Sequence, residues 1–521
     1  MAITTQTGRM EEMKNRKQAG WRRLFASILA LCALTFCAMP AYAAEGFTFK
    51  WDTGDERDST EPHCKSLFMV NLDTDTVVYS LNPDEQLPMA SMTKIMTYIV
   101  AYENIPDIEH AVITVPQSVE DDLAGTGSSL AGVQVGEELT GLQLLYLLMV
   151  PSGNDAAVTL MEYVDDLYES GKIVPEDAPD PEDPGAQGGD ASGTAAEPSM
   201  APAEDRGEGV IDYSGTSYFV QQMNKKAEEL GCRNTHFTNP HGLHDGNHYS
   251  TARDMAAITK YAMTLPNFTK IVSQPWYEKP ATNLSPEVST KMNTNKMLLN
   301  YPDENGNNYF YTYASGIKTG SHDQAGFCLT SSATAYGYTY IIVAMGDMEG
   351  YAQGIHNEMR DSATLYRWAF TSLQKKTIAS QGDVLSSVKL EYAYQKDELL
   401  LAADQNVSVM LPNDVDATSI RVTVDAPESV QAPIRKGEQI GTATLSYVDE
   451  VIATVPVVAT ESVSRSDLIA GWEQGRSLLT SPWFIAVMAA IGALIVVYLI
   501  LVVFYRRKQK MLKRVKKFRD L

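Results

Sequence analysis

The chain has 521 residues, enough for two or three domains, and 42 Lys and Arg against 65 Asp and Glu give it a net charge of −23. That acidity argues against a nucleic-acid-binding protein, which needs a basic face to displace counterions from phosphates. Hydrophobic residues at 44% and charged residues at 21% are typical of a globular protein, and five Cys are too few for a disulfide scaffold.

The N-terminal 43 residues have the pattern of a secretory signal peptide. An uncharged apolar run at 24–39 follows Arg22 and Arg23, and the small-x-small sequence Ala41-Tyr42-Ala43 comes after it. A basic flank, a short apolar core and a site of this form predict export and cleavage. An uncleaved N-terminal membrane anchor is the alternative.

Residues 44–375 mix strand-like and helix-like patterns. Two β-rich runs within 64–81 predict a hairpin, and a strand pair is predicted within 327–346. Helices are predicted for residues 91–104, 142–150, 217–230 and 356–374. This order predicts an α/β or α+β domain.

The composition of the sequence predicts three further segments. Residues 172–209 are rich in Pro, Ala, Gly, Asp and Glu, which predicts a flexible acidic insertion; a docking segment for a partner is the alternative. Short alternating runs between turn signals predict a small all-β domain at 380–460. Residues 461–482 are predicted to be a linker.

The C-terminal region predicts a membrane span. Residues 483–505 form a run of 23 residues without a charge, long enough to cross roughly 30 Å of hydrocarbon as a helix. Residues 506–521 then hold nine Lys and Arg and one acid, so the tail is predicted to be cytoplasmic and the rest of the mature chain extracytoplasmic.

Three Cys remain after the signal segment: Cys64, Cys232 and Cys328. They allow at most one intramolecular disulfide, and the sequence does not choose it. Buried free thiols are the preferred interpretation.

A first chemical motif opens the helix predicted at 91–104. In Ser91-Met92-Thr93-Lys94 a spacing of three places Ser91 and Lys94 on one helical face. Ser needs a base to act as a nucleophile, and a desolvated amine can be that base. Taken by itself, this pattern also suits an ordinary helical turn.

Two more motifs follow along the chain. Ser152-Gly153-Asn154 comes after the apolar helix and offers a hydroxyl for proton relay and an amide for a substrate peptide group, although it also suits a surface turn. Lys318-Thr319-Gly320 precedes an apolar strand and can meet a carboxylate, although it also suits an exposed edge strand. Together and in this order, the three motifs resemble the signature set S-x-x-K, S-D-N and K-T-G of class A β-lactamases and penicillin-binding proteins, with Gly153 at the place of the middle Asp.

On these residues the chain resembles the serine-type D-alanyl-D-alanine carboxypeptidases, the low-molecular-mass penicillin-binding proteins, over about residues 60–460. The resemblance extends to the following segments: 87–91 (LPMAS), 151–157 (PSGNDAA), 239–243 (NPHGL), 248–254 (HYSTARD), 293–296 (NTNK) and 316–320 (GIKTG). It implies a β-lactamase/transpeptidase-like domain, and it identifies the 380–460 segment with the family's C-terminal β-domain.

The resemblance also implies a mechanism and its residues. Ser91 would attack the carbonyl between the two D-Ala residues of a peptidoglycan stem peptide, with Lys94 as general base and Ser152 and Lys318 assisting proton transfer. Asn154 would hold the substrate amide and Thr319 the terminal carboxylate, beside Gly320. The backbone N–H groups of Ser91 and Ser321 would hold the oxyanion. β-Lactams would acylate Ser91 and leave slowly, and no cofactor is implied.

Some residues depart from the family pattern or fall outside it. The family often places an Arg after the last core strands to bind the carboxylate, and Arg360 is the nearest candidate although its register is displaced. His241, His244 and His248 have a metal-like spacing, but Pro240, Gly242 and Gly246 disfavour the helix that would align them, so no metal site is predicted.

The predicted activity is therefore that of a membrane-anchored carboxypeptidase that removes the terminal D-Ala of stem peptides. A D,D-endopeptidase or transpeptidase using the same acyl-enzyme chemistry is one alternative, and a serine β-lactamase is another. A catalytically silent wall-binding scaffold is the alternative from a different class.

Overall fold

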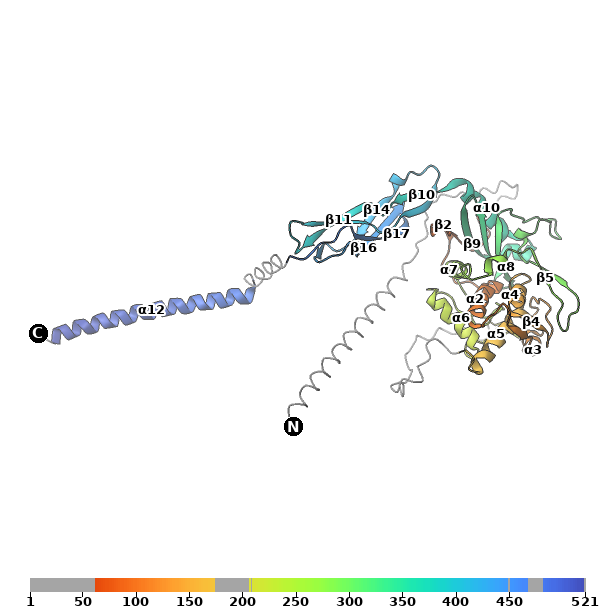
Figure 1. Ribbon diagram of the computed structural model, residues 1–521, viewed down its shortest axis with the longest axis horizontal. Helices are drawn as coiled ribbons and strands as arrows, with labels where there is room; N and C mark the ends of the chain where they lie inside the picture. Colours follow the sequence, from red (N-terminus) through yellow and green to blue (C-terminus); the bar gives the residue numbers. More distant parts are fainter. Residues whose placement is uncertain (1–60, 174–205, 208, 448–449, 467–480, 520–521) are drawn as a thin grey trace, which may run out of the picture. The chain divides into compact units, whose positions relative to one another are not determined.

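The computed structural model describes residues 61–173, 206–207, 209–447, 450–466 and 481–519 (Figure 1). The predicted signal segment, nearly all of the predicted insertion and most of the predicted linker lie outside the described residues. The chain divides into two compact units: the first contains Met1–Lys376, Ser408–Ile420 and Ser446–Ile452, and the second contains Thr377–Val407, Arg421–Leu445 and Ala453–Leu521.

The first unit contains a five-stranded antiparallel sheet with the strand order β2-β1-β9-β8-β7. Its strands are β1 (Ser66–Asn71), β2 (Thr76–Leu81), β7 (Ala314–His322), β8 (Gly326–Ala335) and β9 (Tyr338–Asp347). The predicted hairpin within 64–81 and the strand pair within 327–346 are both confirmed. β7 is an edge strand, with a strand neighbour on one side only.

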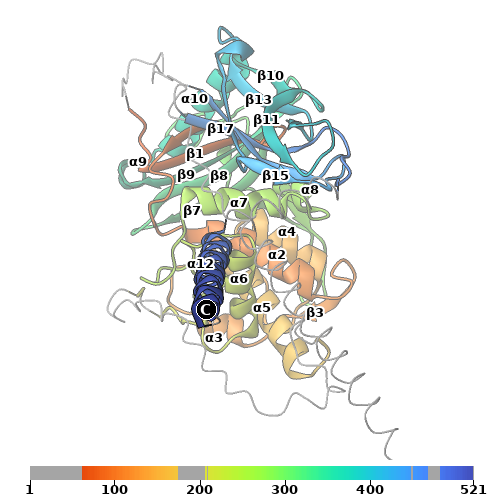
Figure 2. The same cartoon turned by 90° about the vertical axis from the view of Figure 1, so that its left-hand side faces the viewer.

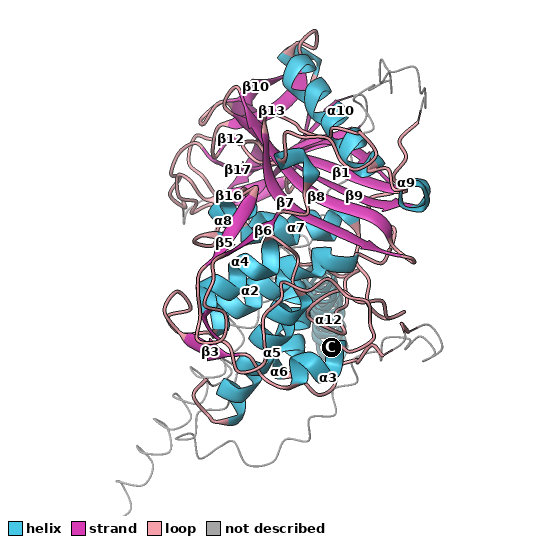
Figure 3. Cartoon of the chain, turned by 90° about the vertical axis from the view of Figure 1, so that its right-hand side faces the viewer, coloured by secondary structure: helices cyan, strands magenta, loops and turns pink. Residues whose placement is uncertain are grey.

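Helices cover both faces of this sheet. Figures 2 and 3 show α7 (Ala252–Ala262) on one face and α10 (Asn357–Ser372) on the other. Beyond α7 lies a cluster formed by α2 (Lys94–Asn104), α4 (Gly141–Met149), α5 (Asn154–Glu169) and α6 (Tyr218–Glu229). The four helices predicted from the sequence correspond to α2, α4, α6 and α10.

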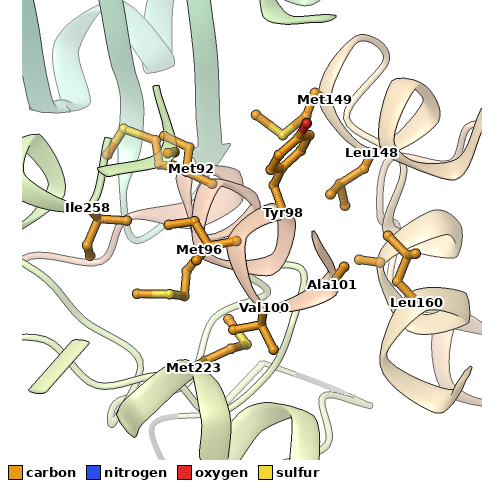
Figure 4. Close-up of a cluster of buried hydrophobic side chains, with 14 of the residues drawn as sticks. Met92, Met96, Tyr98, Val100, Ala101, Leu148, Met149, Leu160, Met223 and Ile258 are labelled. Atoms are coloured by element: carbon orange, nitrogen blue, oxygen red, sulfur yellow. The ribbon is translucent and has the colours of Figure 1, made fainter. Parts of the chain in front are cut away.

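Helix α2 is the centre of the helical cluster (Figure 4). Its buried side chains, with Met92 just before it, pack against α4, α5, α6 and α7; the labelled residues are Met92, Met96, Tyr98, Val100, Ala101, Leu148, Met149, Leu160, Met223 and Ile258. Every residue from Lys94 to Ala101 is buried, so the first residue of α2 lies in the protein interior although it is a lysine.

Short elements complete the first unit. They are η1 (Ala90–Thr93), β3 (Val112–Thr114), α3 (Ser118–Leu123), β4 (Glu138–Thr140), α8 (Phe268–Val272), β5 (Trp276–Lys279), β6 (Ser289–Met292), η3 (Lys296–Leu298), α9 (Met348–Gln353) and η4 (Ala417–Ser419). β3 pairs with β4 and β5 pairs with β6, each pair antiparallel. β10 (Leu373–Ala379) and β13 (Val407–Pro412) form a further two-stranded sheet.

The second unit contains a six-stranded sheet with the order β14-β16-β17-β12-β11-β15. Its strands are β11 (Val384–Glu391), β12 (Glu398–Ala403), β14 (Arg421–Asp425), β15 (Ser429–Gln431), β16 (Gln439–Tyr447) and β17 (Glu450–Ala459). The all-β character predicted for 380–460 is confirmed. Two isolated bridges lie beyond residue 460: Val463 bridges Ile434, and Arg465 bridges Ala393.

The last helix, α12 (Pro482–Arg519), contains the apolar run predicted from the sequence. Its segment Pro482–Gln509 is long and apolar enough to cross a membrane, with a mean hydropathy of 3.0 over its most apolar window. The helix continues into the basic tail. A C-terminal helix of this kind fits membrane anchoring.

Cys64, Cys232 and Cys328 are buried free thiols, as preferred from the sequence. Burial is the main cause that raises the pKa of each of them.

Candidate active site

The local fold brings Ser91 and Lys94 together at the start of α2. Ser91 lies in the 3-10 turn η1, and Lys94 is the first residue of the α-helix that follows. The Nζ atom of Lys94 donates a hydrogen bond to Ser91 Oγ at 2.9 Å. The spacing of three therefore places both side chains on one face, as predicted, although the first turn is 3-10 rather than α.

Lys94 is held by two further acceptors. Its Nζ atom lies 2.6 Å from Asn154 Oδ1 and 2.8 Å from the backbone carbonyl of His241. Burial lowers the pKa of Lys94 well below its usual value, and the positive charge of Lys318 lowers it further. In the neutral form, two N–H groups can stay on Asn154 and His241, and the lone pair then faces Ser91 Oγ.

Ser91 opens onto a cavity of about 770 Å³ in the first unit. Six of the predicted site residues line it: Ser91, Ser152, Asn154, Thr319, Gly320 and Ser321. Lys94 and Lys318 do not line the cavity and lie behind its wall, 0% and 1% exposed. The three motifs therefore converge on one place, although Ser91 and Lys318 are far apart in the sequence.

The second motif forms the turn between α4 and α5. Ser152 has a φ of 66°, a left-handed conformation that non-glycine residues adopt uncommonly. Asp155, next in the chain after Asn154, accepts hydrogen bonds from the backbone N–H groups of Ala131, Gly132 and Val133. This carboxylate fixes the 131–133 loop to the turn that presents Asn154.

The third motif lies on the edge strand β7. Thr319 Oγ1 donates to Thr294 Oγ1 at 2.6 Å, and Lys318 Nζ donates to the Thr319 carbonyl. A Cβ at Gly320 would lie 2.6 Å from the Met89 carbonyl oxygen and 3.2 Å from Ser91 N. Only a residue without a side chain lets β7 approach the Ser91 turn this closely.

Lys318→Met should stabilise the protein near neutral pH, because burial lowers the pKa of Lys318 from 10.5 to about 7. Between these two values the unfolded chain binds a proton that the folded chain does not. The advantage of the variant is therefore largest below pH 7 and shrinks by up to about 1.4 kcal/mol per pH unit as the pH rises. Denaturant unfolding of both proteins at several pH values measures it.

The control for this prediction is Lys270→Met, which removes an exposed lysine of α8. The pH-dependent gain in stability should be confined to Lys318→Met. A constant difference for Lys318→Met would show that the pKa of Lys318 is not depressed in the folded protein.

Gly242 supports the Ser91 turn from the other side. It has a φ of 90°, and a Cβ there would lie 2.0 Å from the Ala90 carbonyl oxygen. Asn239 Oδ1 accepts from the Gly242 N–H at 2.7 Å and holds this segment in place. The 239–243 segment, part of the family resemblance, thus packs directly against the Ser91 turn.

Gly242→Ala should therefore destabilise the protein by about 1–3 kcal/mol. Because the Ala90 carbonyl must move, Ser91 moves with it, and any catalysis that depends on the position of Ser91 should lose about 100-fold in its efficiency, kcat/KM. Thermal unfolding and steady-state kinetics measure the two effects. Gly306→Ala is the matched control, since Gly306 has a φ of 80° and nothing within 4 Å of its Cβ position. Equal losses in both variants would assign the effect to backbone strain alone.

His248, for which the sequence predicts no role, supports the Ser91 turn. Its Nδ1 accepts from the Thr238 N–H at 3.0 Å, so Nε2 bears the proton and donates to Thr93 Oγ1 at 2.7 Å. Thr93 in turn donates to the Ala90 carbonyl at 2.7 Å. Burial lowers the pKa of His248 well below its usual value and keeps this chain of donors in its neutral form.

Arg360 does not lie where the sequence placed it. It does not line the cavity, and its guanidinium donates to Asn307 Oδ1 at 3.0 Å. Glu358, two residues earlier on α10, lines the cavity instead. Residues two apart on a helix point in different directions, so Glu358 and Arg360 cannot both face the cavity.

His241, His244 and His248 lie outside the described helices. His241 Nδ1 accepts from the Leu243 N–H, and burial followed by the charge of Lys94 lowers the pKa of His241 to about 3. Among the described residues, no three His, Cys, Asp or Glu side chains are grouped as metal ligands.

Two family models match the chain. The model described as D-alanyl-D-alanine carboxypeptidase matches residues 54–168 and 212–349, and the model described as the C-terminal domain of penicillin-binding protein 5 matches residues 373–465. The second match extends to residue 465, the last residue that forms a bridge in the β-domain.

Individual proteins are similar as well. The D-alanyl-D-alanine carboxypeptidase DacF of Bacillus subtilis is 26% identical over 86% of this chain and 96% of its own length. The D-alanyl-D-alanine carboxypeptidase of Streptomyces sp. K15 is 30% identical over 53% of this chain and 77% of its own length. Penicillin-binding protein 5 from Haemophilus influenzae shares the fold, with a TM-score of 0.55 over 78% of this chain and 99% of its own, at 23% identity.

Proposed function

The chain belongs to the D-alanyl-D-alanine carboxypeptidase family of serine peptidases, and we propose that Ser91 is the nucleophile with which it removes the terminal D-Ala from peptidoglycan stem peptides. One observation supports this assignment above the others. Among the described residues, Lys94 has its amine within hydrogen-bond distance of Ser91 Oγ while it is fully buried.

Acylation begins when neutral Lys94 takes the proton of Ser91 and Ser91 Oγ attacks the carbonyl carbon between the two D-Ala residues. The negative charge that develops on the carbonyl oxygen is held by the backbone N–H groups of Ser91 and Ser321. The close approach of β7 to the Ser91 turn supports this pairing. The C–N bond breaks, D-Ala leaves with a proton, and an ester on Ser91 remains.

Hydrolysis then completes the reaction. A water gives its proton to the same base and attacks the ester carbonyl, and the shortened stem peptide leaves with Ser91 restored. Ser152 and Lys318 assist proton transfer, Asn154 holds the substrate amide, and Thr319 binds the terminal carboxylate. A β-lactam acylates Ser91 by the same first step and leaves slowly.

The membrane arrangement is part of the same proposal. After removal of residues 1–43, the catalytic domain and the β-domain face the cell wall outside the membrane, which Pro482–Gln509 crosses once. The basic tail then lies in the cytoplasm. This arrangement holds the enzyme next to its peptidoglycan substrate.

Product analysis tests the proposal. The purified protein, incubated with a pentapeptide stem, should release free D-Ala and leave a tetrapeptide. With cross-linked muropeptides, monomers without free D-Ala would identify an endopeptidase, and new cross-links would identify a transpeptidase. Rapid turnover of penicillin would identify a β-lactamase. Binding to isolated cell wall without any of these reactions would identify a scaffold.

A further inference from the structure

A group of aromatic rings lies in the first unit at the end of β8 that points away from the cavity. β8 begins beside the cavity, which Phe327 lines, and ends at Ala335. Tyr336 and Gly337 form the two-residue turn to β9, since Ala335 pairs with Tyr338. At about 3.3 Å per residue along the strand, this turn lies about 30 Å from Phe327. The rings are therefore separate from the site described above.

Tyr336 has a backbone conformation that its side chain disfavours. Its φ is 54° and that of Gly337 is 83°. A two-residue turn with a positive φ at both positions favours Asn-Gly, Asp-Gly or Gly-Gly, and a bulky residue in this conformation is an outlier. Burial of the ring does not offset the strain, because Tyr336 is 72% exposed. Strain that the fold itself does not offset is a feature of functional sites.

Two further rings hold Tyr336 in place. Its ring lies 5.9 Å from the Tyr313 ring and 6.3 Å from the Phe370 ring, and those two rings lie 5.9 Å apart. The hydroxyl oxygens of Tyr313 and Tyr336 share a hydrogen bond at 3.2 Å. Phe370 in turn contacts the rings of Tyr340 and Tyr366, which are both fully buried. We call Tyr313, Tyr336 and Phe370 the aromatic platform, and its buried neighbours make it rigid.

The size of the aromatic platform favours a ligand with a small footprint. Among the described residues 300–340, the exposed large hydrophobic side chains are all aromatic: Tyr301, Phe310, Tyr313 and Tyr336. A stable protein interface needs about 800 Å² from each partner. Three partly exposed rings supply less, because even a whole aromatic side chain buries only about 150–250 Å².

The chemistry of the aromatic platform favours a sugar. Its rings offer apolar faces, and its only side-chain polar groups are the two phenol hydroxyls, which can donate and accept. The hydrogen bond with Tyr336 raises the pKa of Tyr313, so this hydroxyl stays neutral. A sugar ring matches such a surface, because its C–H bonds pack on an aromatic face while its hydroxyls hydrogen-bond at the edge.

The proposed function indicates which sugar polymer is present. Stem peptides of peptidoglycan are attached to glycan strands, so an enzyme that trims them works beside a polysaccharide. A stem of five residues spans at most about 18 Å, which is less than the roughly 30 Å from the cavity to the turn. The stem peptide in the cavity therefore does not reach the aromatic platform, whereas the polymer around it does.

We propose that the aromatic platform is a second binding site, which binds a glycan strand of the cell wall and holds the enzyme on its polymeric substrate. Such attachment raises the local concentration of stem peptides at the cavity. The inference rests on the proposed function for the choice of polymer and adds a site away from the catalytic one.

Binding to glycan without peptides tests the inference. The probe is immobilised glycan strands from cell wall whose stem peptides have been removed, so that the cavity does not contribute. The purified full chain should bind, and Tyr336→Asn should bind about tenfold more weakly because a stacked ring is lost. Asn suits the left-handed turn, so this variant should fold. Tyr313→Ala should weaken binding in the same way.

Tyr394→Asn is the matched control, because Tyr394 is 70% exposed in the turn between β11 and β12 of the second unit. It should bind as the wild type does. Wild-type affinity in both Tyr336→Asn and Tyr313→Ala would overturn the inference, and so would a wild type that does not bind. If Tyr336→Asn instead abolishes self-association in sedimentation and no protein binds glycan, the rings form a protein contact and the inference is wrong.

Release of D-Ala from a soluble pentapeptide by the wild type tests the proposed function separately. Release without glycan binding would remove the inference alone. Glycan binding that depends on Tyr336 supports the aromatic platform even if no D-Ala is released, and in that case only the proposed function fails.

Discussion

Ser91→Ala should abolish both D-Ala release and covalent labelling by fluorescent penicillin. Without Oγ no acyl-enzyme can form, and loss of a serine nucleophile costs on the order of 10⁴–10⁶-fold in turnover. The change removes only the hydroxyl group of Ser91. The turn itself is held by the close packing of Gly242 and Gly320, so the fold should be retained. Gel fluorescence after penicillin treatment and free D-Ala after peptide treatment measure the two losses.

Ser128→Ala is the control for this experiment. Ser128 lines the same cavity, but it accepts its hydrogen bond from Thr126 and has none with Lys94. The variant should label as the wild type does. Labelling of Ser91→Ala at the wild-type rate would show that another residue is the nucleophile.

Lys94→Arg should lower the rate of acylation by on the order of 10³–10⁴-fold although it keeps a positive charge. The proposed base must be neutral before it can take the proton of Ser91, and burial together with the charge of Lys318 lowers the pKa of Lys94 in that direction. A guanidinium stays protonated at any accessible pH and cannot accept the proton of Ser91. The rate of penicillin labelling in the first turnover isolates this step.

Lys270→Arg makes the same exchange at an exposed position and should label normally. Raising the pH should not rescue Lys94→Arg. If the variant labels as fast as the wild type, Lys94 only holds Ser91 by its charge and does not act as the base.

The sequence predicted those parts of the site in which short spacing dictates proximity. Ser91 and Lys94 are one turn apart, and Ser152 and Asn154 share one turn, so local geometry brings each pair together. It also predicted the β1–β2 and β8–β9 hairpins, because each consists of two β-rich runs separated by a short turn. The apolar run of α12 was also predicted from the sequence, because residues 483–505 carry no charge.

The rest depends on contacts between distant segments. His248 supports the Ser91 turn through Thr93, 155 residues earlier, and no spacing encodes such a contact. At the start of α10, Glu358 lines the cavity, whereas Arg360, two positions later, does not. A side chain's direction on α10 is fixed by packing against the sheet, which the sequence pattern gives only to within a turn.

The edge position of β7 has a consequence for the protein as a whole. An unpaired strand edge is a template on which other chains can add, so proteins risk joining edge to edge unless such an edge is covered. Here the last part of β7 forms a wall of the cavity, with Gly242 and the 125–129 loop among the other residues that line it. A second chain would have to enter this cavity to pair with the last part of β7, so the loops that line the cavity hinder edge-to-edge association of the sheet at this strand.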